Sequence, residues 1–122
     1  MGYDMRFYVV NKSEVVKADI KGKVYNFGEI VAQYEYCVDY DLANFIEKNS
    51  KPTDTYIYIN DKETVKDCYG DFMAKIELND LLSYLHNDKG EYRRKKPFIC
   101  LLEGFKEEKE KFENLIILKY GH

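Results

Sequence analysis

Residues 29–46 read EIVAQYEYCVDYDLANFI, and their hydrophobic period changes halfway along the stretch. Over residues 29–38 the side chains alternate between two faces, which is the pattern of a β-strand. One face of this strand carries Ile30, Ala32, Tyr34, Tyr36 and Val38. The period then becomes helical, because two aspartates that can cap a helix lead into a stripe of Leu42, Phe45 and Ile46. The chain therefore passes from sheet to helix within one segment.

The same two periods recur along the rest of the chain. Further strands are expected at residues 3–10, 15–20, 54–60, 72–77 and 114–120, with a turn at residues 21–23. The first of these is expected to be half-buried, and the last is apolar on both faces, which predicts a central strand. Residues 60–71 are polar and predict a long hairpin loop whose return strand is 72–77.

Two more helices are expected in the second half of the chain. Their stripes are Leu78, Leu81, Leu82 and Leu85, and then Phe98, Leu101, Leu102 and Phe105. Asn79 is expected to cap the first, and Pro97 to occupy the first turn of the second. The element order predicts an α+β fold, a single globular domain over residues 1–122. We expect an antiparallel or mixed sheet of about five to six strands, with about three helices packed mainly on one face.

Length and charge exclude several classes of protein. With 122 residues the chain has room for one core, and its net charge of −3 disfavours a non-specific nucleic-acid binder, which needs a basic surface. Residues 1–80 carry 10 Lys and Arg against 15 Asp and Glu, a net charge of −5. Residues 81–122 carry 9 against 7, a net charge of +2. No expected strand leads through a glycine-rich turn into a helix, so neither a P-loop nor a Rossmann phosphate site is predicted.

The cysteines and the apolar runs bear on the compartment. Cys37, Cys68 and Cys100 are far apart and form no C-x-x-C pair, so they predict neither a zinc ribbon nor a disulfide framework. Each is expected to be a small buried hydrophobic residue. The first residues do not resemble a secretion signal, and no run reaches the length of a membrane span. We therefore expect a soluble cytoplasmic protein with no membrane partner.

Tyrosine is the most informative residue type, since the chain has 12 tyrosines and no tryptophan. A tyrosine has a large apolar body and a polar tip, which suits half-exposed sheets and recognition surfaces. Tyr34 and Tyr36, and again Tyr56 and Tyr58, recur at the period of two that places rings on one sheet face. These four are predicted to bind a partner, although the same rings would also suit the core of a small α+β domain.

A basic segment before the third expected helix is the second candidate contact. It consists of Tyr92, Arg93, Arg94, Lys95 and Lys96. Arginine suits forked recognition of a carboxylate or a phosphate, and the neighbouring tyrosine can stack on a bound group. Positive charge is mildly unfavourable at a helix N-terminus, which favours a functional reason for the cluster. The alternative is that these charges neutralise nearby acids or solubilise a loop.

Residues that carry chemistry are sparse. His86 lies at the polar end of an expected helix and His122 is the last residue, so neither is predicted to be catalytic. Several carboxylates fall within two expected strands and their loop, namely Asp54, Asp61, Asp67, Asp71 and Glu77. With Lys75 they leave open a small metal-dependent enzyme acting on nucleotides or nucleic acid, although a solvated hairpin loop is favoured. We predict no catalytic residue, no metal site and no cofactor.

Several stretches resemble small proteins encoded by phages and prophages of low-G+C bacteria. They are YDMRFYVV at 3–10, EIVAQYEYC at 29–37, YGD at 69–71, YRRKKPFICLLEGF at 92–105 and ENLIILKYGH at 113–122. The terminal tyrosine and glycine of that group are similar to Tyr120 and Gly121, while Lys119 and His122 depart from it. The resemblance covers most of the chain, but the group has no settled activity, so it transfers no catalytic residue. It implies an accessory protein that binds a host or defence protein.

Two hypotheses follow from the sequence. The first is a non-enzymatic inhibitor or counter-defence factor of the anti-CRISPR kind. It would bind a host or defence protein through a tyrosine-bearing sheet face, with the basic segment as a second contact. Nucleic acid is a less favoured partner, and both a monomer and a homodimer stay open. The second hypothesis is the metal-dependent enzyme.

Overall fold

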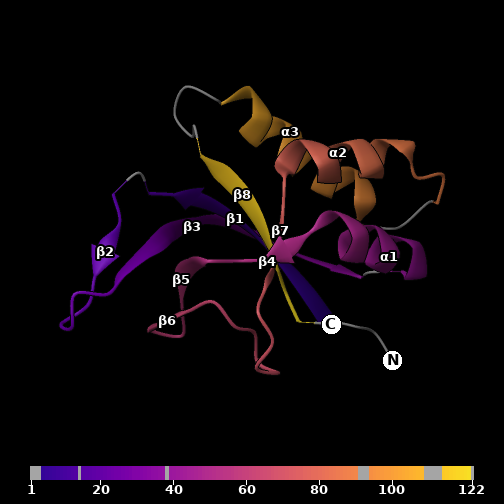
Figure 1. Cartoon of the computed structure of the whole chain (residues 1–122). Helices are drawn as coiled ribbons and strands as arrows, with labels where there is room; N and C mark the ends of the chain where they lie inside the picture. The colour runs from indigo at the N-terminus through magenta and orange to yellow at the C-terminus, as the bar shows by residue number, and fades with distance from the viewer. Residues whose placement is uncertain (1–3, 14, 38, 91–93, 109–113, 122) are drawn as a thin grey trace.

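Three helices and eight strands make up the described part of the protein. The computed structural model describes residues 4–13, 15–37, 39–90, 94–108 and 114–121. Its strands are β1 (Asp4–Lys12), β2 (Lys17–Ala18), β3 (Val24–Cys37), β4 (Lys51–Pro52), β5 (Thr55–Ile59), β6 (Lys62–Thr64), β7 (Ala74–Ile76) and β8 (Leu115–Tyr120). Its helices are α1 (Tyr40–Asn49), α2 (Leu78–Asn87) and α3 (Lys95–Glu107). The predicted α+β class is confirmed, and Figure 1 shows the helices gathered to one side of the sheet.

The strands form one mixed sheet in the order β4-β7-β8-β1-β3-β5-β6, with β2 paired to β3 beside this path. Of the strand pairs in the described residues, only β3 and β5 run parallel. Strand β8 is central, as predicted, between β7 and β1. The sheet has more strands than predicted, because β4 and β6 are two and three residues long and leave no periodic pattern in the sequence.

Strand β1 is buried on both faces, which corrects the expectation of a half-buried first strand. Phe7 and Val9 belong to the apolar cluster that contains the helices, whereas Tyr8 and Val10 belong to a second cluster across the sheet. A bulge between Val9 and Val10 interrupts the pairing of β1 with β3. A bulge bends a strand and increases its twist, so this position favours a curled sheet.

The main core lies between the helices and one face of the sheet. Its fully buried members include Phe7, Leu42, Ile76, Leu81, Leu85, Phe98, Leu102 and Ile117. All three helices contribute to this cluster, and none contributes to the second one. The prediction that the helices pack mainly on one face is therefore confirmed.

Local signals set two of the three helix starts. Asp39, one of the two aspartates expected to cap α1, accepts a hydrogen bond from the Leu42 N–H at 2.8 Å. Helix α3 begins at Lys95, so Pro97 lies in its first turn as predicted. The predicted Asn79 cap of α2 is wrong. That helix begins at Leu78, a core residue, and the preceding Glu77 makes no side-chain capping bond.

A second, smaller core lies on the opposite face, because the sheet curls over it. Its buried members are Tyr8, Val10, Ile57, Met73, Ile116 and Leu118. Strand β6 follows β5 after a tight turn at Asn60 and Asp61, which both have positive φ, as hairpin turns of this kind require. The predicted long hairpin of residues 54–77 is therefore wrong. The expected return strand contains β7, which pairs with β4 and β8 instead.

An arm formed by β2 and the first residues of β3 extends away from the helices (Figure 1). Its tip is the predicted turn. The Asp19 carboxylate accepts hydrogen bonds from the backbone N–H groups of Lys21 at 2.9 Å and Lys23 at 2.8 Å, and Gly22 has a φ of 83°. The strand expected over residues 15–20 shortens to Lys17 and Ala18. In the described part of the chain, no helix is long and apolar enough to cross a membrane.

Candidate functional site

One row of side chains crosses four strands on the part of the sheet that carries the arm. We call the aromatic face the set of Lys17 from β2, Tyr25 and Phe27 from β3, Tyr56 and Tyr58 from β5, and Glu63 from β6. The strand register places them in neighbouring pairs, Lys17 opposite Tyr25, Phe27 opposite Tyr56, and Tyr58 opposite Glu63. Residues that face each other across a ladder share one side of a sheet, so these six form a continuous surface.

Aromatic rings surround a cation at the centre of the aromatic face. The Lys17 ammonium lies 4.5 Å from the centre of the Phe27 ring and 5.2 Å from that of Tyr58. Both distances fall within the range at which the negative face of a ring attracts a cation. The rings of Tyr25 and Tyr56 meet edge to face, with their centres 5.1 Å apart. The face is therefore held together by ring contacts between strands that are far apart in the sequence.

A carboxylate completes this cluster. Glu63 Oε1 lies 2.6 Å from Lys17 Nζ, and Glu63 Oε2 accepts a hydrogen bond from the Tyr25 hydroxyl at 2.8 Å. The hydrogen bond with Lys17, followed by those from Tyr25 and Tyr58, lowers the pKa of Glu63. The same hydrogen bond with Glu63 raises the pKa of Lys17. Both groups are therefore charged at neutral pH, and each compensates the other.

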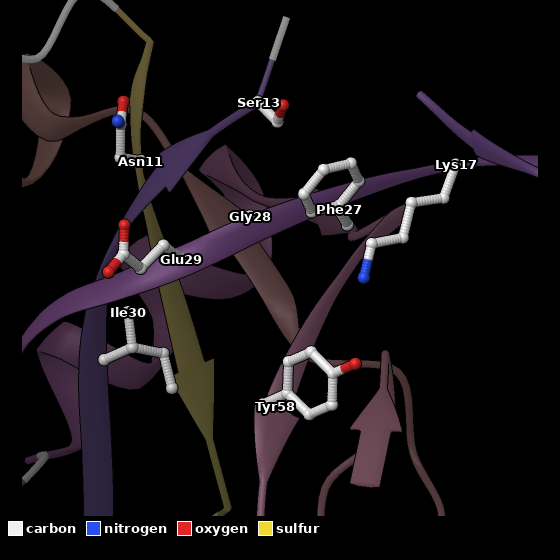
Figure 2. A pocket seen from close by; sticks show the side chains of 8 residues that line it. All are labelled: Asn11, Ser13, Lys17, Phe27, Gly28, Glu29, Ile30 and Tyr58. Carbon is white, nitrogen blue, oxygen red and sulfur yellow. The ribbon is translucent and has the colours of Figure 1, made fainter. Parts of the chain in front are cut away.

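A pocket of about 540 Å³ opens beside the aromatic face (Figure 2). It is lined by Asn11, Ser13, Lys17, Phe27, Gly28, Glu29, Ile30 and Tyr58. Gly28 leaves room for the close approach of three strands here, since a Cβ atom on it would lie 2.5 Å from Val10 Cγ1 and 3.2 Å from Thr55 Cγ2. The volume lies in the range of small-molecule pockets, and it also suits one or two side chains of a partner.

The structure separates the four tyrosines that the sequence predicts to bind a partner. Tyr56 is half-buried and Tyr58 is 58% exposed, and both lie on the aromatic face. Tyr36 is only 4% exposed and packs against Phe98 in the main core. This burial contradicts the prediction that Tyr36 is an exposed docking residue. The period of two identifies residues that share a face, but it does not say which face the helices cover.

Tyr34 also faces the helices, where it supports the basic segment. Its ring stacks on that of Phe98 with centres 4.9 Å apart, and its hydroxyl donates a hydrogen bond to the Arg94 carbonyl at 2.9 Å. The Arg94 guanidinium lies 4.7 Å from the centre of the same ring. Arg94 thus lies at the exposed end of a stack that continues through Tyr34 into the core.

The other basic residues differ in what they can reach. Lys95 is a structural residue. Its ammonium donates hydrogen bonds to the carbonyls of Asp88 and Gly90, the second at 2.9 Å, and lies 3.6 Å from the Asp88 carboxylate. For Lys95, the structure therefore confirms the alternative that the basic segment neutralises nearby acids. Lys96 is exposed. The predicted contacts Tyr92 and Arg93 lie outside the described residues.

Two of the predicted carboxylates of residues 54–77 accept hydrogen bonds within the fold. Asp54 accepts a hydrogen bond from the Asn26 amide at 3.1 Å, and Asp67 accepts two from the backbone N–H groups of Tyr69 and Asp71. Among the residues that the structure describes, no group of three or more His, Cys, Asp or Glu side chains is arranged to hold a metal ion.

The remaining reactive side chains lie on other surfaces. His86 Nε2 lies 2.6 Å from Glu103 Oε1, in an exposed pair between α2 and α3. Cys68 and Cys100 are exposed, so the expectation that they are buried is wrong. Neither cysteine lines the pocket beside the aromatic face.

The sequence patterns do not identify Lys17, Phe27, Glu29 and Glu63 as site residues. A weak signal existed for Phe27, because residues 24–30 alternate as the first half of a strand that was expected to begin only at residue 29. Lys17 and Glu63 lie on strands of two and three residues, which are too short for a periodic pattern. Comparison of the chain with protein-family models, with curated proteins and with solved structures finds no match.

Proposed function

We propose that this protein is a non-enzymatic accessory protein of the phage type that binds a host or defence protein, as an inhibitor or counter-defence factor of the anti-CRISPR kind. The observation that carries the proposal is the aromatic face with its open pocket. Tyrosine is among the residues that contribute most to binding energy at protein interfaces. Tyr58 combines high exposure with a ring that lines a concave surface.

The aromatic face is also preorganised. Ring contacts and the Lys17–Glu63 pair fix the side chains before any partner arrives, so binding orders few additional groups. Ordering each flexible side chain on binding costs about 0.5–1.5 kcal/mol. A face that already holds its rings in place avoids part of that cost.

Arg94 supports a second contact at the other end of the molecule. Its guanidinium lies over the Tyr34 ring, which leaves the N–H groups at the guanidinium edge for a forked interaction. Among the described residues, no carboxylate forms an ion pair with Arg94. An acidic segment of the partner is the group that this residue would recognise.

Affinity capture from a host lysate tests the proposal, with Tyr58→Ala as the main variant and Tyr40→Ala as its control. Tyr40 is 80% exposed and lies at the start of α1, away from the aromatic face. We expect one protein to be retained by the wild type and by Tyr40→Ala, and to be lost with Tyr58→Ala. Arg94→Ala should weaken the same capture, more strongly at low salt. Equal retention by the wild type and Tyr58→Ala contradicts the proposal.

A further inference from the structure

One charged residue that lines the pocket beside the aromatic face has no ion-pair partner among the residues that the structure describes. Its two charged lining residues are Lys17 and Glu29. Lys17 is paired with Glu63 at 2.6 Å. Within the described parts of the chain, no Lys, Arg or His nitrogen lies within 4.0 Å of the Glu29 carboxylate. The pocket therefore presents a net negative charge to whatever enters it.

The walls of the pocket are apolar next to that charge. Figure 2 shows Glu29 and Ile30 on one side of the hollow, and Phe27 and Tyr58 on the other. The side chains of Asn11 and Ser13 add an amide and a hydroxyl nearby. A carboxylate beside aromatic and aliphatic walls suits a group with an apolar stem and a cationic end.

The protein already holds one such group in this place. The ammonium of Lys17 lies against the faces of Phe27 and Tyr58 with its charge on Glu63. Those contacts show that both rings present their negative faces to a cation. Glu29 lines the same pocket, so its carboxylate offers a second anionic group to a cation that enters beside these rings.

We propose that this pocket receives a lysine or arginine side chain of a protein partner. The cationic end pairs with Glu29, and the methylene stem packs against Phe27, Ile30 and Tyr58. The inference rests on the proposed function and names the chemistry of its contact. Charge complementarity favours a basic protein over nucleic acid, since residues 1–80 carry a net charge of −5.

The test is an NMR titration of the ¹⁵N-labelled protein with a lysine whose amino and carboxyl termini are blocked. A blocked norleucine, which has a similar stem and no charge, is the control ligand. We expect the lysine analogue to shift the amide signals of residues 27–30 and 58, and the norleucine analogue to leave them nearly unchanged. Glu29→Gln should weaken the response about threefold, and added salt should reduce it. Glu35→Gln, an exposed glutamate on the same strand, should leave it unaltered.

Three outcomes overturn the inference. They are an equal response to both analogues, a response that Glu29→Gln does not change, and the absence of any response at millimolar analogue. A response abolished by Glu63→Gln but not by Glu29→Gln would mean that the ligand displaces Lys17, which also contradicts the assignment to Glu29.

The titration needs no partner, so its failure is distinguishable from failure of the proposed function. If capture depends on Tyr58 but the lysine analogue does not bind, the proposal of a basic side chain in the pocket is refuted. The aromatic face then remains the proposed docking site. If the analogue binds but Tyr58→Ala does not change capture, the proposed function is refuted. The pocket then remains a site that selects cations.

Discussion

Gly28 lies where β1, β3 and β5 approach one another closely. A Cβ atom there would lie 2.5 Å from Val10 Cγ1, inside the second core, and 3.1 Å from the Asn11 carbonyl oxygen. Gly28→Ala should therefore lower the free energy of unfolding by about 1–3 kcal/mol, because a well-packed site must move to admit the methyl group. Urea unfolding followed by circular dichroism measures the change.

Gly104 provides the matched control for that substitution. It lies inside α3, and a Cβ atom on it would meet nothing within 4 Å. Gly104→Ala should raise the free energy of unfolding by about 0.5–1 kcal/mol, because alanine loses less backbone entropy in a helix. A loss of stability in both variants would contradict this account of Gly28.

Glu63 gives the arm a predictable response to pH. Its pKa is lowered from the ordinary value of 4.5, so the charged form stabilises the fold above about pH 4.5. That contribution is lost as the pH falls from 4.5 through the lower pKa of the folded protein. In Glu63→Gln the contribution is absent at every pH. The difference in unfolding free energy between wild type and variant should therefore shrink below pH 4.5, and a constant difference from pH 7 to pH 3 would contradict the role of the Lys17–Glu63 pair.

At the scale of elements, Lys95 ties the start of α3 to Asp88 and Gly90, which follow α2. Its ammonium satisfies the carbonyls of Asp88 and Gly90 and pairs with the Asp88 carboxylate. Lys95→Met keeps most of the stem but leaves those acceptors without their donor, which should cost about 1–3 kcal/mol of stability. Lys96→Met, at the exposed neighbouring position, should change stability by less than about 0.5 kcal/mol. Thermal unfolding of the two variants compares them directly, and equal melting temperatures would contradict the structural role of Lys95.

The helices were more predictable than the strands because their signals are local. The Asp39 cap and the leucine stripe of α2 lie within a few residues of the elements they specify. Strand partners depend on residues far away in the chain. Strand β5 pairs in parallel with the beginning of β3 and not with residues 72–77, and nothing in the alternation of residues 54–60 distinguishes these partners. Short strands such as β6 carry too few residues to show any period.

The same limit applies to the candidate site. Alternation correctly placed Tyr56 and Tyr58 on one face, since both belong to the aromatic face. It could not show that the equally regular Tyr34 and Tyr36 lie beneath α3, because coverage by a helix is decided by the whole fold. The cation and the carboxylate at the centre of the site, Lys17 and Glu63, are 46 residues apart and meet only through the strand order.

At the scale of the whole molecule, the curl of the sheet connects the second core to the aromatic face. Ile57 is fully buried in that core, and its neighbours Tyr56 and Tyr58 point to the other side of β5. Ile57→Ala should lower the free energy of unfolding by about 2–5 kcal/mol. Ile20→Ala, at the exposed tip of the arm, should change it by less than about 0.5 kcal/mol. Similar denaturation midpoints for these two variants would contradict the second core.

The brevity of the outermost strands has a consequence for how the protein behaves at high concentration. A broad sheet with a long free margin offers a row of unpaired N–H and C=O groups on which other chains can grow into fibrils. Here β4 and β6 stand at the two ends of the strand order, with two and three residues, and Pro52 in β4 has no N–H to offer. The apolar strand β8 would be prone to aggregate if its edge were free, but it pairs with β1 on one side and β7 on the other. The two ends of this strand order therefore offer few free backbone groups for such growth, although the aromatic side chains nearby stay exposed.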